Sequence, residues 1–301
     1  MRISQQITRT IKADLANYLT YLRNLNRQRN PIESVHQLRV SCRRLYNFFW
    51  VYRALFVRKA VERWLAHFEH VIDELSDARD LDVQLQNLKA LRRNFQKEGR
   101  KTLGIEEVIG RTQKRRKDIE LTLAKYLKQR RHEAMAKQIR LSLPKMAAKT
   151  RKLSKQEFEA LGLKRIRKRA VALYAMRSYA RRRSDVSSLH RLRIRAKRLR
   201  FTMEALQPVF DKTLNGPLAV VRDVQKHLGI MHDYDVWMAE LETYRRDDEH
   251  FMGMKLLLSA MMKEVRQKRD ASYLKFFAVW QKSVENGLWV RLQDGVLNRK
   301  V

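Results

Sequence analysis

Apolar side chains recur at helical spacing along most of the chain. They fall three or four positions apart from Ile3 to about Asn26, and again in a segment that starts near Ser34 and ends near Phe56. Because an α-helix turns about 100° per residue, this spacing gathers the apolar side chains on one face. The same argument predicts helices over residues 58–75, 84–96, 105–142, 163–183, 189–210, 218–228 and 254–286. The pattern therefore predicts an all-α protein.

Two of the predicted helices also carry a basic stripe opposite their apolar face. Each stripe is a histidine followed by cations three and seven positions later, with further cations beside them: His36, Arg39, Arg43 and Arg44 in the first helix, and His190, Arg193, Lys197, Arg198 and Arg200 in the second. The apolar faces consist of Leu38, Cys42, Leu45, Phe49, Tyr52 and Phe56, and of Leu192, Ala196, Leu199, Met203, Leu206 and Phe210. Each helix thus has one face for a core and another for a charged partner.

Further segments repeat at nearly the same interval, which predicts an internal duplication. The two histidines lie 190 − 36 = 154 residues apart. The same interval separates Arg23 from Arg177 and Arg27 from Arg181. Asp80-Leu81-Asp82-Val83 corresponds to Asp233-Tyr234-Asp235-Val236 at 233 − 80 = 153 residues. We predict a joint between Pro144 and Ser154, and a turn at Asn215-Gly216-Pro217. The result is two repeats, residues 1–152 and 153–301, each a bundle of about four helices.

The charge of the chain is its dominant chemical feature. It contains 66 Lys and Arg against 32 Asp and Glu, which gives a formal net charge of +34. Such a surplus destabilises a compact state through self-repulsion, and a polyanionic partner relieves it. Nucleic acid, an anionic membrane surface and inorganic polyphosphate are the candidate partners.

Cysteine content and hydropathy indicate the compartment. The one cysteine, Cys42, lies on an apolar face and excludes an intramolecular disulfide, which is typical of a reducing cytoplasm. No apolar run approaches the ~20 residues that span a bilayer, and residues 1–15 lack the apolar block of a signal peptide. We therefore expect a cytoplasmic protein without a membrane partner.

The repeated pattern His-x-x-Arg-x-x-x-[Arg/Lys]-Arg-Leu, followed each time by Asp-x-Asp-Val, resembles the CHAD family over nearly the whole chain. The resemblance implies two four-helix bundles around a basic central channel, and binding of inorganic polyphosphate in association with polyphosphate granules. It implies polyphosphate contacts at His36, Arg39, Arg43, Arg44, His190, Arg193, Lys197, Arg198 and Arg200. Arg23, Arg27, Arg177 and Arg181, which repeat at the same interval, are added to the predicted contacts.

The residue types suit a phosphate chain. Arginine offers a planar fork of donors to phosphate oxygens, and lysine a mobile point charge. Side chains three and four positions apart on a helix can follow a row of phosphates. His36 and His190 are interpreted as hydrogen-bond donors to phosphate, with a buried structural role as the alternative. A metal-ligand role is disfavoured because the neighbouring arginines repel a cation.

The four repeated aspartates allow two readings. Residues two apart point to different faces of a helix, so neither Asp80 with Asp82 nor Asp233 with Asp235 is a ready chelate. We predict that they cap helices and pair with nearby arginines, which orients the basic stripes. His232-Asp233 resembles the His-Asp pair of helical metal phosphohydrolases, but the first copy has Arg79-Asp80 in its place.

The sequence therefore predicts a non-enzymatic polyphosphate-binding protein, with no metal, cofactor or catalytic residue. Two alternatives stay open. The first is a nucleic-acid-binding basic protein, and the second is a metal-dependent polyphosphate hydrolase. The aromatic residues are not interleaved with the basic stripes as a base-stacking platform requires, so most are predicted to be core.

Overall fold

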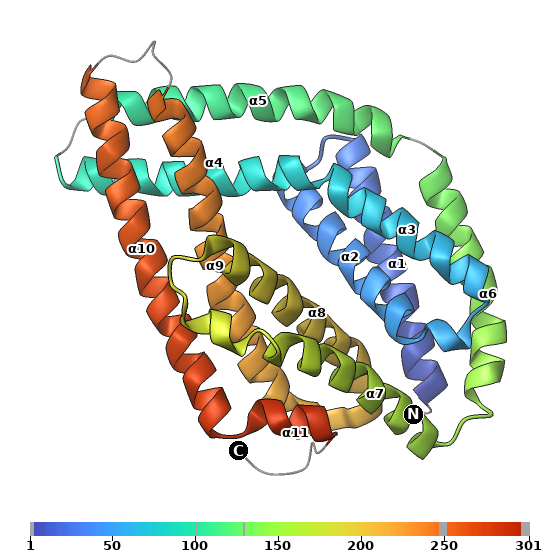
Figure 1. Cartoon of the computed structure of the whole chain (residues 1–301). Coiled ribbons are helices and arrows are strands. Elements are labelled where there is room, and N and C mark those ends of the chain that lie inside the picture. The colour runs from blue at the N-terminus through green and yellow to red at the C-terminus, as the bar shows by residue number, and fades with distance from the viewer. Residues whose placement is uncertain (1–2, 100–101, 129, 247–251, 296–301) are drawn as a thin grey trace. The chain divides into compact units, whose positions relative to one another are not determined.

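The computed structural model describes residues 3–99, 102–128, 130–246 and 252–295, and that part of the chain contains helices and no strand (Figure 1). The predicted all-α class is confirmed. The chain divides into two compact units, Met1–Phe158 and Glu159–Val301. In the same residues, no helix has the length and apolar character needed to cross a membrane.

The first unit is built from paired helices. Its elements are α1 (Ile3–Asn26), α2 (Pro31–Val51), the 3-10 turn η1 (Arg53–Leu55), α3 (Arg58–Glu74), α4 (Ser76–Lys97), α5 (Leu103–Leu127) and α6 (Arg131–Thr150). α1 packs against α2 and α6, α2 packs against α3, and α4 runs beside α5 (Figure 1). This unit is therefore divided into more helices than the four expected.

The core of the first unit confirms the predicted apolar face of α2. Leu38, Cys42 and Leu45 are fully buried. The Phe49 ring lies 4.9 Å from the Trp64 ring of α3, measured between ring centroids. Phe56 is only half-buried, since α2 ends at Val51 rather than near Phe56. Close packing of these side chains fixes which face of α2 is left for charged residues.

The second unit is dominated by three long helices. Its elements are α7 (Lys155–Tyr174), which begins just before the unit boundary, η2 (Arg177–Arg181), α8 (Val186–Phe210), η3 (Asp211–Leu214), α9 (Asn215–Arg246), α10 (Met252–Glu285) and α11 (Leu288–Asp294). α9 packs along α8 on one side and along α10 on the other (Figure 1). The predicted apolar face of α8 is buried, with Leu192, Ala196, Leu199 and Met203 fully inaccessible.

Two predicted boundaries at prolines differ in the structure. Pro144 lies inside α6, so the predicted joint contracts to the short link between Thr150 and Lys155. Separately, the predicted helix over 105–142 is divided into α5 and α6. The predicted turn at Asn215-Gly216-Pro217 is instead the first turn of α9. Proline is well tolerated there because a first-turn N–H has no intrahelical acceptor.

Candidate functional site

Four nitrogen-bearing side chains gather between α8 and α9 in the second unit. His190, Arg193 and Lys197 come from α8 and His232 comes from α9, and all four are half-buried. We call them the second basic cluster. Nδ1 of His190 lies 3.0 Å from Nδ1 of His232, with the ring centroids 4.4 Å apart. One imidazole therefore donates a hydrogen bond to the other.

The electrostatics of the second basic cluster disfavour charged histidines. Burial, then Arg193 and Lys197, lower the pKa of His190. Burial, then Arg193, His190 and Lys197, lower the pKa of His232 to about 4. Both causes act by penalising the imidazolium form. Without a bound anion, the cluster near neutral pH therefore combines two neutral imidazoles with two permanent cations.

A corresponding first basic cluster lies between α2 and α4. It comprises His36, Arg39 and Arg43 of α2, and Arg79 of α4. Burial lowers the pKa of His36, and Arg79 is the largest electrostatic cause. Arg79 and His232 were not among the contacts predicted from the sequence. Their shared interval, 232 − 79 = 153 residues, was the signal that relates them.

Arg39 requires a correction. It was expected on an open basic face, yet it is 8% exposed. Its Nη1 donates to the carbonyl oxygens of Leu75 and Ser76, at 3.3 and 3.2 Å, and lies 3.9 Å from Oδ1 of Asp80. Leu75 is where α3 ends and α4 begins, and its carbonyl oxygen also accepts the backbone N–H of Arg79 at 3.1 Å. Arg39 therefore ties α2 to the junction between α3 and α4.

The second unit has no such junction. The residue corresponding to Leu75 is Leu228, and α9 continues through it without a break. Arg193, the counterpart of Arg39, consequently has no helix junction beside it at this position, and it is half-buried rather than buried. The same sequence motif therefore lies beside a helix junction in the first unit and beside a continuous helix in the second.

Among the described residues, each unit contains a buried ion pair whose aspartate acts electrostatically on a member of its cluster. Oδ1 of Asp82 lies 2.9 Å from Nε of Arg116, and Oδ1 of Asp235 lies 2.9 Å from Nε of Arg269. Both arginines are nearly inaccessible, at 7% and 4% exposure. Burial raises the pKa of both carboxyl groups, and the paired arginines oppose that rise. These pairs join α4 to α5 and α9 to α10.

The four aspartates were predicted to cap helices and to pair with arginines. The capping prediction is wrong, because Asp80, Asp82, Asp233 and Asp235 lie inside α4 and α9 rather than at a helix start. The arginine partners of the two buried aspartates, Arg116 and Arg269, were not identified from the sequence. The signal was available, because 269 − 116 = 153 and each arginine follows its aspartate by 34 residues. The repeated pair is what an internal duplication produces, and the duplication itself stays a prediction. Asp80 and Asp233, by contrast, are exposed, as expected for helical residues two positions from a buried one.

The other predicted contacts have separate surroundings. Arg44 is exposed and lies 3.7 Å from Asp14 of α1, and Arg198 is exposed. Arg200 donates to Gln225 and lies 3.3 Å from Glu204. Arg23 donates to its own helix at Leu19, and the remaining predicted contacts are also exposed: Arg27, Arg177 and Arg181. Their role as contacts stays a prediction.

The His232-Asp233 pair does not form a chelate in this geometry. His232 turns to His190, whereas Asp233 is exposed. Within the described ranges, no three side chains among His, Cys, Asp and Glu gather as a metal-binding group would require. The arrangement is instead suited to anions, since two cationic side chains lie beside two imidazoles.

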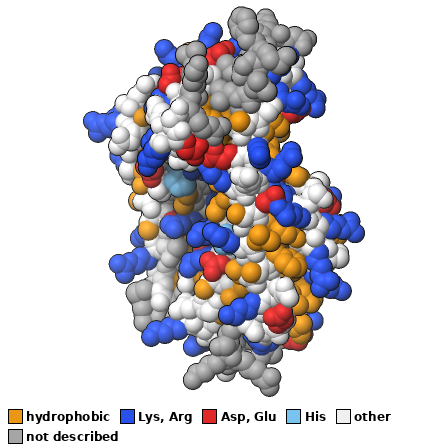
Figure 2. Space-filling model, turned by 90° about the vertical axis from the view of Figure 1, so that its left-hand side faces the viewer, with side chains coloured by type: hydrophobic (Ala, Val, Ile, Leu, Met, Phe, Trp, Pro, Cys, Tyr) orange, Lys and Arg blue, Asp and Glu red, His pale blue; other side chains and the backbone are white. Residues whose placement is uncertain are grey.

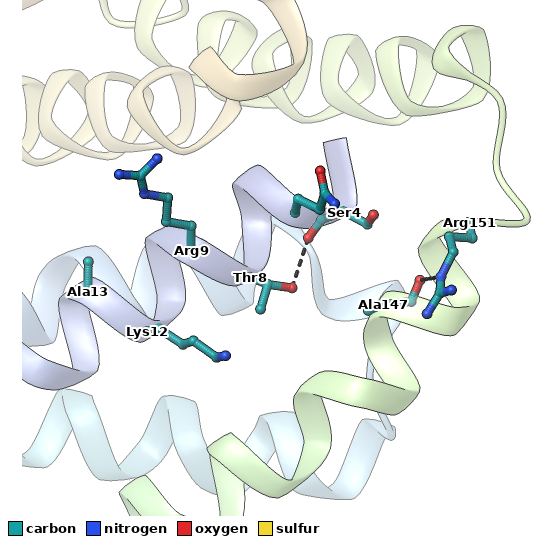
Figure 3. Close-up of a pocket in the computed structure, with 8 residues that line it drawn as sticks. Ser4, Thr8, Arg9, Lys12, Ala13, Ala147 and Arg151 are labelled. Carbon is teal, nitrogen blue, oxygen red and sulfur yellow. Dashed lines mark hydrogen bonds between the residues drawn. The ribbon is translucent and has the colours of Figure 1, made fainter. Parts of the chain in front are cut away.

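Basic groups also occur away from the clusters. Figure 2 shows Lys and Arg side chains at many places on the described part of the visible face. In the first unit, a groove of about 780 Å³ between α1 and α6 is lined by Arg9, Lys12 and Arg151 with smaller residues between them (Figure 3). Such groups add non-specific attraction for any polyanion.

Comparison with known proteins identifies the family. No curated protein matches the chain in sequence. PptA from Streptomyces chartreusis shares its fold with a TM-score of 0.64 at 15% identity, over 93% of this chain and 100% of that one. The CHAD domain from the plant Ricinus communis does so with a TM-score of 0.57 at 18% identity, over 100% and 93%. The CHAD domain profile matches residues 9–242. The chain therefore belongs to the CHAD domain family.

Proposed function

We propose that this protein binds inorganic polyphosphate through its two basic clusters and thereby docks on polyphosphate granules. The observation that carries the proposal is the second basic cluster, where Arg193 and Lys197 stand beside two imidazoles. Asp235 of α9, which raises the pKa of His190, is paired with Arg269 of α10. The cluster places two cationic side chains beside two imidazoles, which suits an anion, and membership of the CHAD family supports polyphosphate as that anion.

The two clusters differ in what we expect of them. In the second, all four side chains are proposed to contact phosphate. In the first, His36, Arg43 and Arg79 are proposed as contacts, and Arg39 is proposed to hold the junction of α3 with α4, because its donors face backbone carbonyls. Two sites in one chain strengthen binding of any ligand long enough to reach both, since the second contact forms at high effective concentration.

Nucleic acid is the second candidate ligand, favoured by the net charge of +34. Neutralising a row of phosphates releases counterions whatever the identity of the polyanion, so the charge alone does not discriminate. The clusters favour polyphosphate, because they offer cationic and imidazole groups on a short stretch of two helices, and because no Phe, Tyr or Trp side chain is exposed in the part of the chain that the structure describes, as a stacking platform would require.

We further propose that binding is not followed by cleavage. Long polyphosphate incubated with the full chain and Mg²⁺ or Mn²⁺ should co-elute with the protein in gel filtration and be recovered at unchanged chain length. Failure to co-elute at physiological salt would contradict the binding proposal. Shortening that disappears in the Asp233→Ala variant would instead support the hydrolase.

A further inference from the structure

The contact between His190 and His232 restricts where protons can lie. The hydrogen bond between their Nδ1 atoms, at 3.0 Å, needs one proton between the two nitrogens. In the neutral pair, the accepting ring carries its own proton on Nε2, whereas the donating ring has a bare Nε2 lone pair. The neutral pair therefore offers a phosphate one N–H donor and one repelling lone pair.

One added proton changes this pattern without breaking the contact. If the bare Nε2 takes up a proton from solvent, both rings present an Nε2–H and the Nδ1 hydrogen bond is retained. The singly protonated pair then offers two donors and one positive charge. A second proton would have to enter the Nδ1 contact itself and would destroy it. The geometry thus defines a unit that holds one extra proton.

We propose that His190 and His232 bind phosphate oxygens as one such unit, so that the second basic cluster takes up a proton when polyphosphate binds. The inference rests on the proposed function and adds His232 to its contacts. It also gives the site a dependence on pH that its permanent cations cannot provide.

The surroundings of the pair favour this coupling. Arg193 and Lys197 face both imidazoles from α8 and lower their pKa, so the free pair is neutral near pH 7. Asp235 on α9 raises the pKa of His190, but it is held by Arg269 of α10. A bound phosphate chain adds negative charge directly at the pair and raises the pKa of both rings. Proton uptake and phosphate binding therefore promote each other.

The first basic cluster differs in this respect. Arg79 occupies the place of His232 and stays charged at every accessible pH. His36 can respond to a bound anion alone, but there is no second imidazole there to share the proton. His36 contributes the same proton uptake to the wild type and to a variant of the histidine pair. The difference in proton uptake between the two proteins therefore belongs to the pair.

The test is calorimetric titration of the full chain with long polyphosphate at pH 8, 7 and 6, in two buffers that differ in ionisation enthalpy. Long chains are used because their internal phosphates stay fully ionised over this range. The protein should take up protons on binding, and affinity should rise toward pH 6, by up to about tenfold per pH unit for a full proton. Thermal unfolding at each pH verifies that the fold is intact.

His190→Gln with His232→Gln is the matched variant, because His232→Gln alone would leave the bare Nε2 of His190 able to take up the proton. Two glutamine amides can hydrogen-bond to each other and donate to phosphate, but neither can be protonated. The double variant should take up clearly fewer protons and lose most of the strengthening of binding at acid pH, whereas His227→Gln, on the same helix as His232 and outside the pair, should match the wild type. Equal proton uptake in the double variant and the wild type would overturn the inference alone. Absence of binding at every pH would overturn the proposed function and the inference with it.

Discussion

Replacing Arg193 and Lys197 together by alanine should weaken the binding of long polyphosphate roughly a hundredfold. Each charge-assisted hydrogen bond is worth about 1.5 kcal/mol or more, and every 1.4 kcal/mol is tenfold in affinity. Both side chains are half-buried and lie next to the histidine pair, so a phosphate bound there is partly shielded from water. Affinity measured by titration with chains of defined length tests the expectation.

The control is Lys114→Ala with Arg115→Ala, which removes the same charge from the exposed side of α5. This pair should matter much less, because solvent and salt screen an exposed charge. Arg43→Ala with Arg79→Ala tests the first cluster while leaving Arg39 at its helix junction. Loss of either cluster should affect long chains far more than short oligophosphates, which cannot reach both. Equal losses in all three variants, following only the charge removed, would mean that neither cluster is a site.

Removing either buried arginine, Arg116→Ala or Arg269→Ala, should lower the free energy of unfolding by about 3 kcal/mol or more, because it strands a buried carboxylate. Asp82 and Asp235 are almost inaccessible, and each lies 2.9 Å from its arginine. Without the arginine, the pKa of the carboxyl group should rise further. Protonation of that carboxyl group then stabilises the folded variant, so the deficit should be smaller at pH 5 than at pH 8.

Denaturant unfolding at both pH values measures this deficit. Lys117→Ala and Arg266→Ala are the matched controls, since both residues are exposed on the same helices. They should change stability by no more than about 0.5 kcal/mol. If Arg116→Ala and Arg269→Ala behaved like these controls, the buried pairs would not be what joins α4 to α5 and α9 to α10.

The apolar faces of α2 and α8 could be predicted from the sequence because they depend only on helical period. Leu38 and Leu192 are buried as that period requires. The surroundings of Arg39 and Arg193 do not follow from helical period. The two arginines hold the same place in the same motif, but a helix ends beside Arg39 at Leu75, and α9 continues beside Arg193. That difference is set by tertiary packing, which no local pattern contains.

Helical periodicity likewise could not predict contacts between residues that are distant in the sequence. Arg116 follows Asp82 by 34 residues, and only the packing of α5 on α4 brings them together. The contact of His232 with His190 depends in the same way on α9 lying along α8. For both, the repeat interval of 153 residues held the information, although the spacing alone could not say which residues touch.

Competition between long polyphosphate and duplex DNA for the full chain, at equal total charge and physiological salt, tests the central claim most directly. Each basic cluster holds its cationic and imidazole groups on one pair of packed helices, which suits a thin chain better than a duplex. We predict that polyphosphate displaces labelled DNA at a much lower charge concentration than unlabelled DNA does, and that Arg193→Ala with Lys197→Ala reduces this advantage. Equal displacement per charge, unchanged in the variant, would contradict polyphosphate binding at the clusters and would favour a general polyanion-binding protein.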